Sequence, residues 1–237
     1  KITLNAGLRL QHNQVYGNKW IPSAGFAWQS NESTTFKASF SKGFRSPTIR
    51  ELFLWGPNPK LQPEELFSYE VGILKTFSQR KIKTELTAFL LKGSNLIISV
   101  PMKGLQNAGD ILNKGLEFSA DAQPTNQLNI HTAYSYIHMK NPVYATPGHQ
   151  LYISAGYRIK QTNFRLSIQK VANLDTDPSA NVHLENYTLL NARIGYRFCR
   201  FAEAFINGEN LLNQKYEQNR YYTMPGATFF GGINLSL

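Results

Sequence analysis

Two groups of side chains in this sequence could contact a ligand. Phe53 and Trp55 lie close together and close to Asn58, and the run Arg220-Tyr221-Tyr222 places a cation beside two phenols. Aromatic rings stack on flat groups and a guanidinium attracts π-systems and anions, so these residues are candidates for binding an anionic, aromatic ligand. The alternative is that the rings only pack within loops or form an interfacial aromatic belt.

No catalytic constellation is present in the sequence. It contains no GxSxG, no HExxH and no glycine-rich phosphate loop. The histidines show no close ligand spacing, and the single cysteine, Cys199, allows neither an internal disulfide nor a cysteine metal site. We therefore predict that the protein is not an enzyme and that it holds no metal and no cofactor.

Charge and hydropathy exclude two further classes. The formal net charge is +10, but the basic residues are scattered and no nucleic-acid-binding signature occurs, so we predict no nucleic-acid partner. A solvated lumen, or loops that face an anionic lipid or ligand, accounts for the charge equally well. Mean hydropathy is −0.34 and no run of 18 apolar residues occurs, which excludes helical membrane spans.

Alternation of apolar and polar residues runs through most of the chain. In the segment 189–198, Leu190, Ala192 and Ile194 share one face while Asn191 and Arg193 share the other. Such alternation predicts strands with one apolar and one polar face. About twelve segments follow it, near 1–12, 20–30, 34–45, 66–77, 82–98, 108–122, 127–139, 149–160, 163–173, 187–198, 202–212 and 228–237.

Segment length and loop length favour a membrane barrel. Each segment has about ten residues, the length that a tilted strand needs to cross a bilayer. Short connections (Gln29–Thr34, Phe77–Ile82, Gln123–Gln127, Lys160–Asn163, Phe198–Phe201) alternate with longer ones (Ser46–Glu65, Ser99–Ala108, Met139–Gly148, Val171–Asn186, Asn213–Ala227). Outer-membrane barrels have this asymmetry, with short turns in the periplasm. The predicted fold is all-β, an antiparallel transmembrane β-barrel; a soluble β-sandwich or lipocalin-like barrel is the alternative.

Three sequence segments resemble motifs of the TonB-dependent outer-membrane receptor family. The segment 43–53 resembles its FRAPT-x-x-EL box, 58–64 followed by Tyr69-Glu70-Val71-Gly72 resembles NPxLxPE and YExG, and 208–229 resembles the ending before the last strand. The matching residues are Phe44, Arg45, Pro47, Glu51, Asn58, Pro59, Leu61, Pro63, Glu64, Asn210, Leu211, Tyr216, Pro225 and Gly226. Alternatively, these segments only shape loops, because their prolines stiffen the chain.

The resemblance implies a 22-stranded barrel with a plugged lumen. Residues 1–237 would be the C-terminal portion, about the last twelve strands, with the plug domain and the first barrel half absent. The implied function is active, TonB-dependent uptake of a scarce nutrient, an iron–siderophore or cobalamin, in the bacterial outer membrane. The alternatives are a passive porin and a haem receptor of the same family; haem is disfavoured because 49–57 contains no histidine.

The same resemblance implies the partners of the protein. TonB would act through the missing N-terminal plug, and the polar strand residues Asn191, Arg193 and Arg197 would face that plug. Outer-membrane lipid and lipopolysaccharide would surround a monomeric barrel. Two residues depart from the family pattern: Leu237 replaces a terminal aromatic residue, and Ala227 replaces an arginine that often follows Pro-Gly.

Overall fold

The computed structural model describes residues 1–54, 57–77, 81–100, 103–140, 143–177 and 182–235, and most of these residues are in β-strands. The main sheet has twelve antiparallel strands in the order β1-β2-β3-β4-β5-β6-β7-β8-β9-β10-β11-β14. Neighbours in the sheet are therefore almost always neighbours in sequence. The edge strands of this order are β1 and β14.

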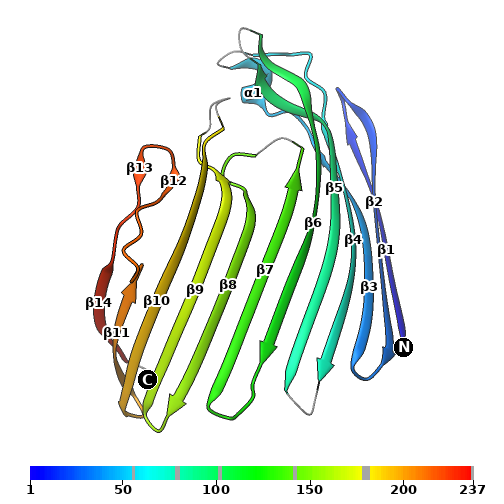
Figure 1. Cartoon of the computed structure of the whole chain (residues 1–237). Helices are drawn as coiled ribbons and strands as arrows, with labels where there is room; N and C mark the ends of the chain where they lie inside the picture. Colours follow the sequence, from blue (N-terminus) through cyan, green and yellow to red (C-terminus); the bar gives the residue numbers. More distant parts are fainter. Residues whose placement is uncertain (55–56, 78–80, 101–102, 141–142, 178–181, 236–237) are drawn as a thin grey trace. The chain divides into compact units, whose positions relative to one another are not determined.

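The elements have the following bounds, and Figure 1 labels them along the chain: β1 Ile2–Asn13, β2 Gly17–Asn31, β3 Thr34–Arg45, α1 Ile49–Phe53, β4 Glu64–Phe77, β5 Ile82–Val100, β6 Gly104–Ala122, β7 Leu128–Met139, β8 Pro147–Ile159, β9 Thr162–Asp175, β10 Leu184–Cys199, β11 Ala202–Glu209, β12 Glu217–Asn219, β13 Tyr222–Thr223 and β14 Thr228–Leu235. The small strands β12 and β13 form a separate two-stranded sheet.

Two compact units divide the described chain. The first comprises 1–74, 87–115 and 138–141, and the second comprises 75–86, 116–137 and 142–237. The first unit therefore holds β1 to β3, α1 and parts of β4 to β6, and the second holds β8 to β11 and β14. No helix in the described part of the chain is long and apolar enough to cross a membrane.

The predicted segments agree with the strands of the main sheet. Each of the twelve segments overlaps one of these strands, so the all-β, antiparallel prediction is confirmed. The predicted long connection Ser99–Ala108 is wrong, because β5 continues to Val100 and β6 begins at Gly104. Asn107 helps to hold this extension, since its Nδ2 donates to the Asn95 carbonyl at 2.7 Å.

The register preserves the two faces that the sequence predicted. Ile168 on β9 lies opposite Ile153 on β8 and Leu190 on β10, while the next residue, Gln169, lies opposite Tyr152 and Leu189. In Figure 1, β8, β9 and β10 run side by side. Ile168 remains 38% exposed and Ile194 51% exposed, so the apolar face is not covered by the described chain. An exposed apolar face of this kind needs a non-aqueous surrounding.

The buried core of the second unit is small and lies where the last long connection meets the sheet. Val171, Leu174, Tyr187 and Tyr216 form it. The rings of Tyr187 and Tyr216 have centroids 4.3 Å apart. Tyr216 thereby ties the connection after β11 to β10, with an aromatic pair of the kind that contributes about 0.5–1.5 kcal/mol beyond burial.

The two faces of β9 predict opposite responses to an added charge. Ile168→Lys should destabilise the protein that contains this chain by about 2–4 kcal/mol, because the ammonium would enter the hydrocarbon that the apolar face is predicted to contact. Gln169→Lys, on the polar face of the same strand, should cost less than about 1 kcal/mol. Unfolding by urea in phospholipid vesicles measures both, and equal destabilisation would show that both faces are in water.

Candidate functional site

The first motif segment forms a short capped helix that is held by an ion-pair network. Thr48 caps α1, with its Oγ1 accepting from the Glu51 backbone N–H, while the Glu51 carboxylate accepts from the Thr48 N–H at 2.7 Å. Arg45 donates to both Glu51 oxygens, at 3.0 and 3.1 Å. This bidentate pair fixes the helix against the end of β3.

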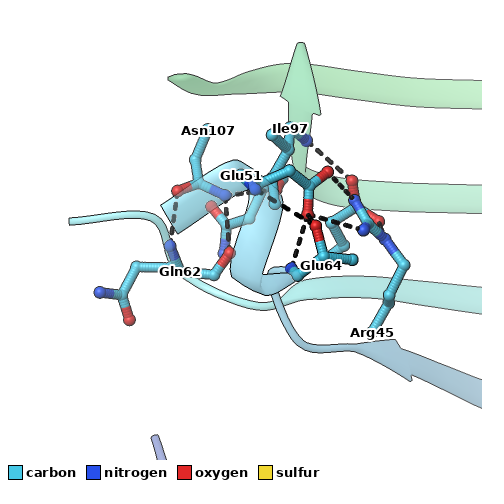
Figure 2. A network of polar contacts seen from close by, with 8 residues as sticks. Arg45, Glu51, Gln62, Glu64, Ile97 and Asn107 are labelled. Atoms are coloured by element: carbon cyan, nitrogen blue, oxygen red, sulfur yellow. Dashed lines mark hydrogen bonds and ion pairs between the residues drawn. The ribbon is translucent and has the colours of Figure 1, made fainter. Parts of the chain in front are cut away.

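Figure 2 shows how this network continues into the next strands. Arg45 Nε donates to Glu64 Oε2, and Glu64 Oε1 accepts from the Ile97 N–H at 2.8 Å. One arginine and two glutamates therefore connect β3, α1, β4 and β5 within the first unit. The pKa of Glu51 is lowered to about 2, mainly by the hydrogen bonds that Arg45 donates to its carboxylate. The carboxylate is therefore held ionised.

The second motif segment is an extended strap tied to β6. Asn58 Nδ2 donates to the Leu105 carbonyl at 2.8 Å. Asn107 Oδ1 accepts from the Gln62 N–H at 2.6 Å, and its Nδ2 donates to the Gln62 carbonyl. Leu61 is 1% exposed. Pro47 and Pro63 are buried as well, whereas Pro59 lies in the turn after Asn58 and is exposed.

The third motif segment turns about Asn210, which is 4% exposed and adopts a left-handed φ of 48°. Its N–H donates to Asn191 Oδ1, its Nδ2 donates to the Gln214 and Pro225 carbonyls, and its Oδ1 accepts from the Gln214 N–H. One amide side chain thus joins three points of the last long connection. The next residue, Leu211, donates its N–H to the Leu190 carbonyl at 2.8 Å.

Position 226 in this segment requires a glycine for a steric reason. A Cβ on Gly226 would lie 2.4 Å from Asn213 Oδ1, which accepts from the Ala227 N–H at 3.0 Å. Pro225 and Gly226 therefore close the turn tightly against Asn213. Phe44, the remaining motif residue, is half-buried, and Lys19 Nζ lies 5.8 Å from its ring centroid.

The predicted ligand contacts fall into three structural classes. Phe53 is 62% exposed at the end of α1, and Tyr221 and Tyr222 are 81% and 73% exposed around the turn between β12 and β13. Asn58 and Arg220 instead make contacts within the protein. Trp55 lies outside the described residues. Phe53 belongs to the first unit, and the other exposed rings belong to the second.

Arg220 belongs to a contact that the sequence reading missed. Its Nη1 donates to the Asp177 carboxylate, and its N–H donates to the Thr176 carbonyl at 2.9 Å. Asp175 Oδ1 in turn accepts from the Asp177 and His183 N–H groups. Two loops distant in sequence thus meet here. The Asp-Thr-Asp run was a local signal for a turn, but nothing in the sequence paired it with Arg220.

A polar cavity of about 590 Å³ lies on the polar face of the second unit, near the short connections. Arg165 and Arg193 both line it and are direct cross-strand partners. Like charges directly opposite each other are destabilising. Glu203 offsets part of the charge, at 3.4 Å from Arg193 and 4.0 Å from Arg197. The cavity is therefore suited to an anionic or hydrogen-bond-accepting group.

Histidine chemistry in the described chain is limited to pairs. His131 Nδ1 lies 2.7 Å from Asp121 Oδ1, and His149 Nδ1 lies 2.9 Å from the Tyr134 hydroxyl. Among the described residues, no cluster of three or more histidine, cysteine or acidic side chains could hold a metal ion.

A comparison with protein families identifies the chain. Residues 1–211 match the model described as "TonB dependent receptor-like, beta-barrel". The chain belongs to the TonB-dependent receptor family. The members of this family are receptors and transporters of the bacterial outer membrane, not enzymes. The three motif segments lie in or directly after the matched region.

Individual relatives and solved structures are similar to this chain along nearly its whole length. The vitamin B12 transporter BtuB of Vibrio cholerae is 26% identical over 242 residues, which cover 97% of this chain and 39% of BtuB. The siderophore receptor PiuA of Acinetobacter baumannii superposes with a TM-score of 0.83 at 16% identity, over 99% of this chain and 41% of PiuA. A mutant of the ferric enterobactin receptor PfeA of Pseudomonas aeruginosa gives 0.82 at 16% identity, over 100% of this chain and 43% of PfeA.

The hydrogen bonds of Asn210 predict a large local effect of its removal. Asn210→Ala should destabilise the connection 210–227 by about 2–4 kcal/mol, because partly buried backbone groups lose their bonds and alanine is strained at positive φ. Asn210→Gly removes the same bonds without the strain and should cost about 1 kcal/mol less. Hydrogen exchange of this connection measures both, and wild-type protection in Asn210→Ala would contradict the assigned role.

The Glu51 pKa predicts that α1 loosens in acid. Because the folded-state pKa of about 2 lies below the usual 4.5, the ionised carboxylate stabilises α1 above pH 4.5, and this is lost as the pH falls toward 2. Between pH 6 and pH 3 the protection of the Leu52 and Leu54 amides should fall by about 1 kcal/mol, after allowance for solvent screening. Glu51→Gln should weaken this pH dependence, and an unchanged dependence would exclude Glu51 as its cause.

Proposed function

We propose that the protein containing this chain is an outer-membrane receptor for active, TonB-dependent uptake of a scarce nutrient. The observation that carries the proposal is the family match over residues 1–211. The chain spans about two-fifths of the length of the relatives it matches. In the proposal it supplies the C-terminal portion, about the last twelve strands of a 22-stranded barrel, and a plug domain and the first barrel half come from elsewhere in the protein.

Orientation follows from the connections. The short turns after β2, β6, β8 and β10 would lie in the periplasm, and the connections that carry the three motif segments would face the exterior. On that side the ion pairs of Arg45 and the hydrogen bonds of Asn210 would hold the loops in fixed positions. Ligand contacts could then be made by exposed side chains without reordering the strands beneath them.

The proposed mechanism assigns no bond-making to this chain. The ligand would bind external loops and the plug, and TonB would act on the plug to open a path. The cavity lined by Arg165, Arg193 and Glu203 would receive acceptor groups of the plug, which would relieve the repulsion between the two arginines. The polar face would thus enclose and position the plug. The apolar face, surrounded by outer-membrane lipid and lipopolysaccharide, would hold a monomeric barrel in the membrane.

The proposed ligand is an iron–siderophore or cobalamin. Relatives named for vitamin B12 and for siderophores support these classes. Haem is a weaker alternative because 49–57 contains no histidine, and a passive porin would not need the three motif segments. Phe53, Tyr221 and Tyr222 are exposed and remain proposed contacts, with Trp55. Arg220 and Asn58 would act by positioning their loops, since both already bond within the protein.

Uptake by the full-length receptor tests the proposal. Cells that express it should accumulate radiolabelled cobalamin or one ferric siderophore, and the accumulation should require TonB. Replacing Tyr221 and Tyr222 together by alanine should weaken ligand binding about tenfold, because two stacking surfaces are lost. Tyr196→Ala, on the apolar face near the short turn after β10, is the control and should bind normally.

Two results would contradict this proposal. TonB-independent leakage of many small solutes would indicate a porin. Uptake of haem, but of neither cobalamin nor a siderophore, would replace the substrate class and leave the receptor mechanism in place.

A further inference from the structure

Three arginines gather on the polar face of the second unit, at the end of the sheet that carries the short turns after β8 and β10 (Figure 1). Arg165 on β9 is the direct cross-strand partner of Arg193 on β10. Arg158 on β8 is the partner of Asn163, two positions before Arg165, so it lies on the same face. The three side chains line the polar cavity of about 590 Å³, which we call the arginine cavity.

The charge of the arginine cavity is not balanced within the described chain. Glu203 is the one carboxylate among the residues that line it. This group is shared, since it lies 3.4 Å from Arg193 and 4.0 Å from Arg197. Within the described ranges, neither Arg158 nor Arg165 has a carboxylate at ion-pair distance. Three guanidinium groups and one carboxylate leave the cavity with a net charge of +2.

Arg193 is held in one position by its neighbours on β11. Its guanidinium carbon lies 3.8 Å from the Phe205 ring centroid, and its Nη2 lies 3.4 Å from Glu203 Oε1. A Cβ on Gly195 would lie 2.8 Å from that same oxygen, so the glycine leaves room for the carboxylate. A guanidinium that is already fixed loses less conformational entropy when it binds an anion. The cavity is therefore organised before any ligand arrives.

Carboxamide groups complete the lining. Asn129 lies over Gly156, where a Cβ would be 2.3 Å from the Asn129 Oδ1. Arg158 Nε donates to the Asn163 Oδ1 at 2.9 Å, which leaves the other guanidinium N–H groups of Arg158 for a ligand. Guanidinium groups bind the paired oxygens of carboxylates in a bidentate manner. The volume of the cavity also lies within the range of small-molecule sites, roughly 300–1,000 Å³.

We propose that the arginine cavity is a luminal binding site for an anionic ferric chelate, one whose iron is held by carboxylate or catecholate oxygens. The inference rests on the proposed function and narrows its substrate class to anionic iron–siderophores. Acceptor groups of the plug would occupy the cavity at rest, and oxygens of the chelate would replace them when TonB displaces the plug. Exchange of one anion for another avoids exposing the repulsion between Arg165 and Arg193.

Charge also explains why such a chelate is preferred to cobalamin. A cleft lined by charge of one sign raises the local concentration of ligands of the opposite sign. The phosphate of cobalamin is balanced by the positive charge of its cobalt centre, so this ligand gains little from the arginines. A chelate with several negative charges gains from all three.

Uptake by cells that express the full-length receptor is the first test, with a trianionic ferric tris-catecholate chelate as the labelled probe. Arg165→Gln/Arg193→Gln should lower the maximal TonB-dependent rate at least about fivefold, because two charge-assisted contacts are lost. The affinity of the chelate for the cell surface, measured without TonB, should not change. Lys160→Gln/Arg200→Gln removes equal charge from exposed positions in the short turns and should transport like the wild type.

Block of ionic current tests the site without TonB and without any match between the chelate and the external loops. The full-length receptor in a planar bilayer should conduct through its lumen once urea unfolds the plug, and the tris-catecholate chelate should block this current. Arg165→Gln/Arg193→Gln should raise the half-blocking concentration at least about fivefold. A neutral ferric tris-hydroxamate chelate of similar size should block both proteins equally.

A variant of opposite effect keeps the test decisive if the arginine variant folds poorly. Glu203→Gln should lower the half-blocking concentration several-fold, because Arg193 and Arg197 lose the carboxylate that competes with the chelate. The control Lys160→Gln/Arg200→Gln should be blocked like the wild type.

Three results would overturn the inference. These are TonB-dependent uptake of cobalamin but of no anionic chelate, equal block of the two double variants, and weaker block of Glu203→Gln. TonB-independent leakage of many solutes would instead contradict the proposed function, and it would leave the result of the block measurement unchanged.

Discussion

In hydrocarbon every backbone N–H and C=O needs a partner within the protein, and the rest of this structure depends on that requirement. It favours long antiparallel strands, paired with sequence neighbours in a single row of twelve. It also confines irregular backbone to the strand ends. There side-chain amides supply partners: Asn58, Asn107 and Asn210 bond backbone groups of Leu105, Gln62 and Pro225. The motif residues thus satisfy, at the ends of the strands, the same requirement that pairing satisfies along them.

Two polar systems hold the motif segments in different ways. Around Arg45 the bonds are charge-assisted, with two carboxylates on one guanidinium. Around the buried Asn210 they join neutral groups, so nothing in them titrates. The first system therefore responds to pH and salt, and the second does not. A receptor that must keep loop geometry in varied surroundings gains from having the turn before β14 fixed by the neutral system.

The strands could be predicted from the sequence because alternation is a local signal. In β9, for example, the neighbours Ile168 and Gln169 already indicate which face of the strand is apolar and which is polar. The sequence predicted the motif residues by resemblance, but not their roles. The Thr48-x-x-Glu51 capping box is a local signal for the start of a helix, but α1 has only five residues, too few to show a helical pattern of apolar residues. Asn107 and Asp177 gave no signal, since their partners lie 45 and 43 positions away. The proposed ligand contacts, such as Tyr221, follow no local pattern, because exposed rings satisfy no structural constraint.

The row of strands has a consequence for the order of folding. Apart from the last, every pairing joins consecutive strands, so hairpins can form one after another with short loop closures. The step from β11 to β14 is different, because the connection 210–227, which contains the small β12–β13 sheet, must fold before β14 can pair with β11. The contacts of Asn210 and Tyr216 bring the parts of this connection together. Strand β14 is therefore placed by a polar turn, and folding would be delayed there in any variant in which that turn forms slowly.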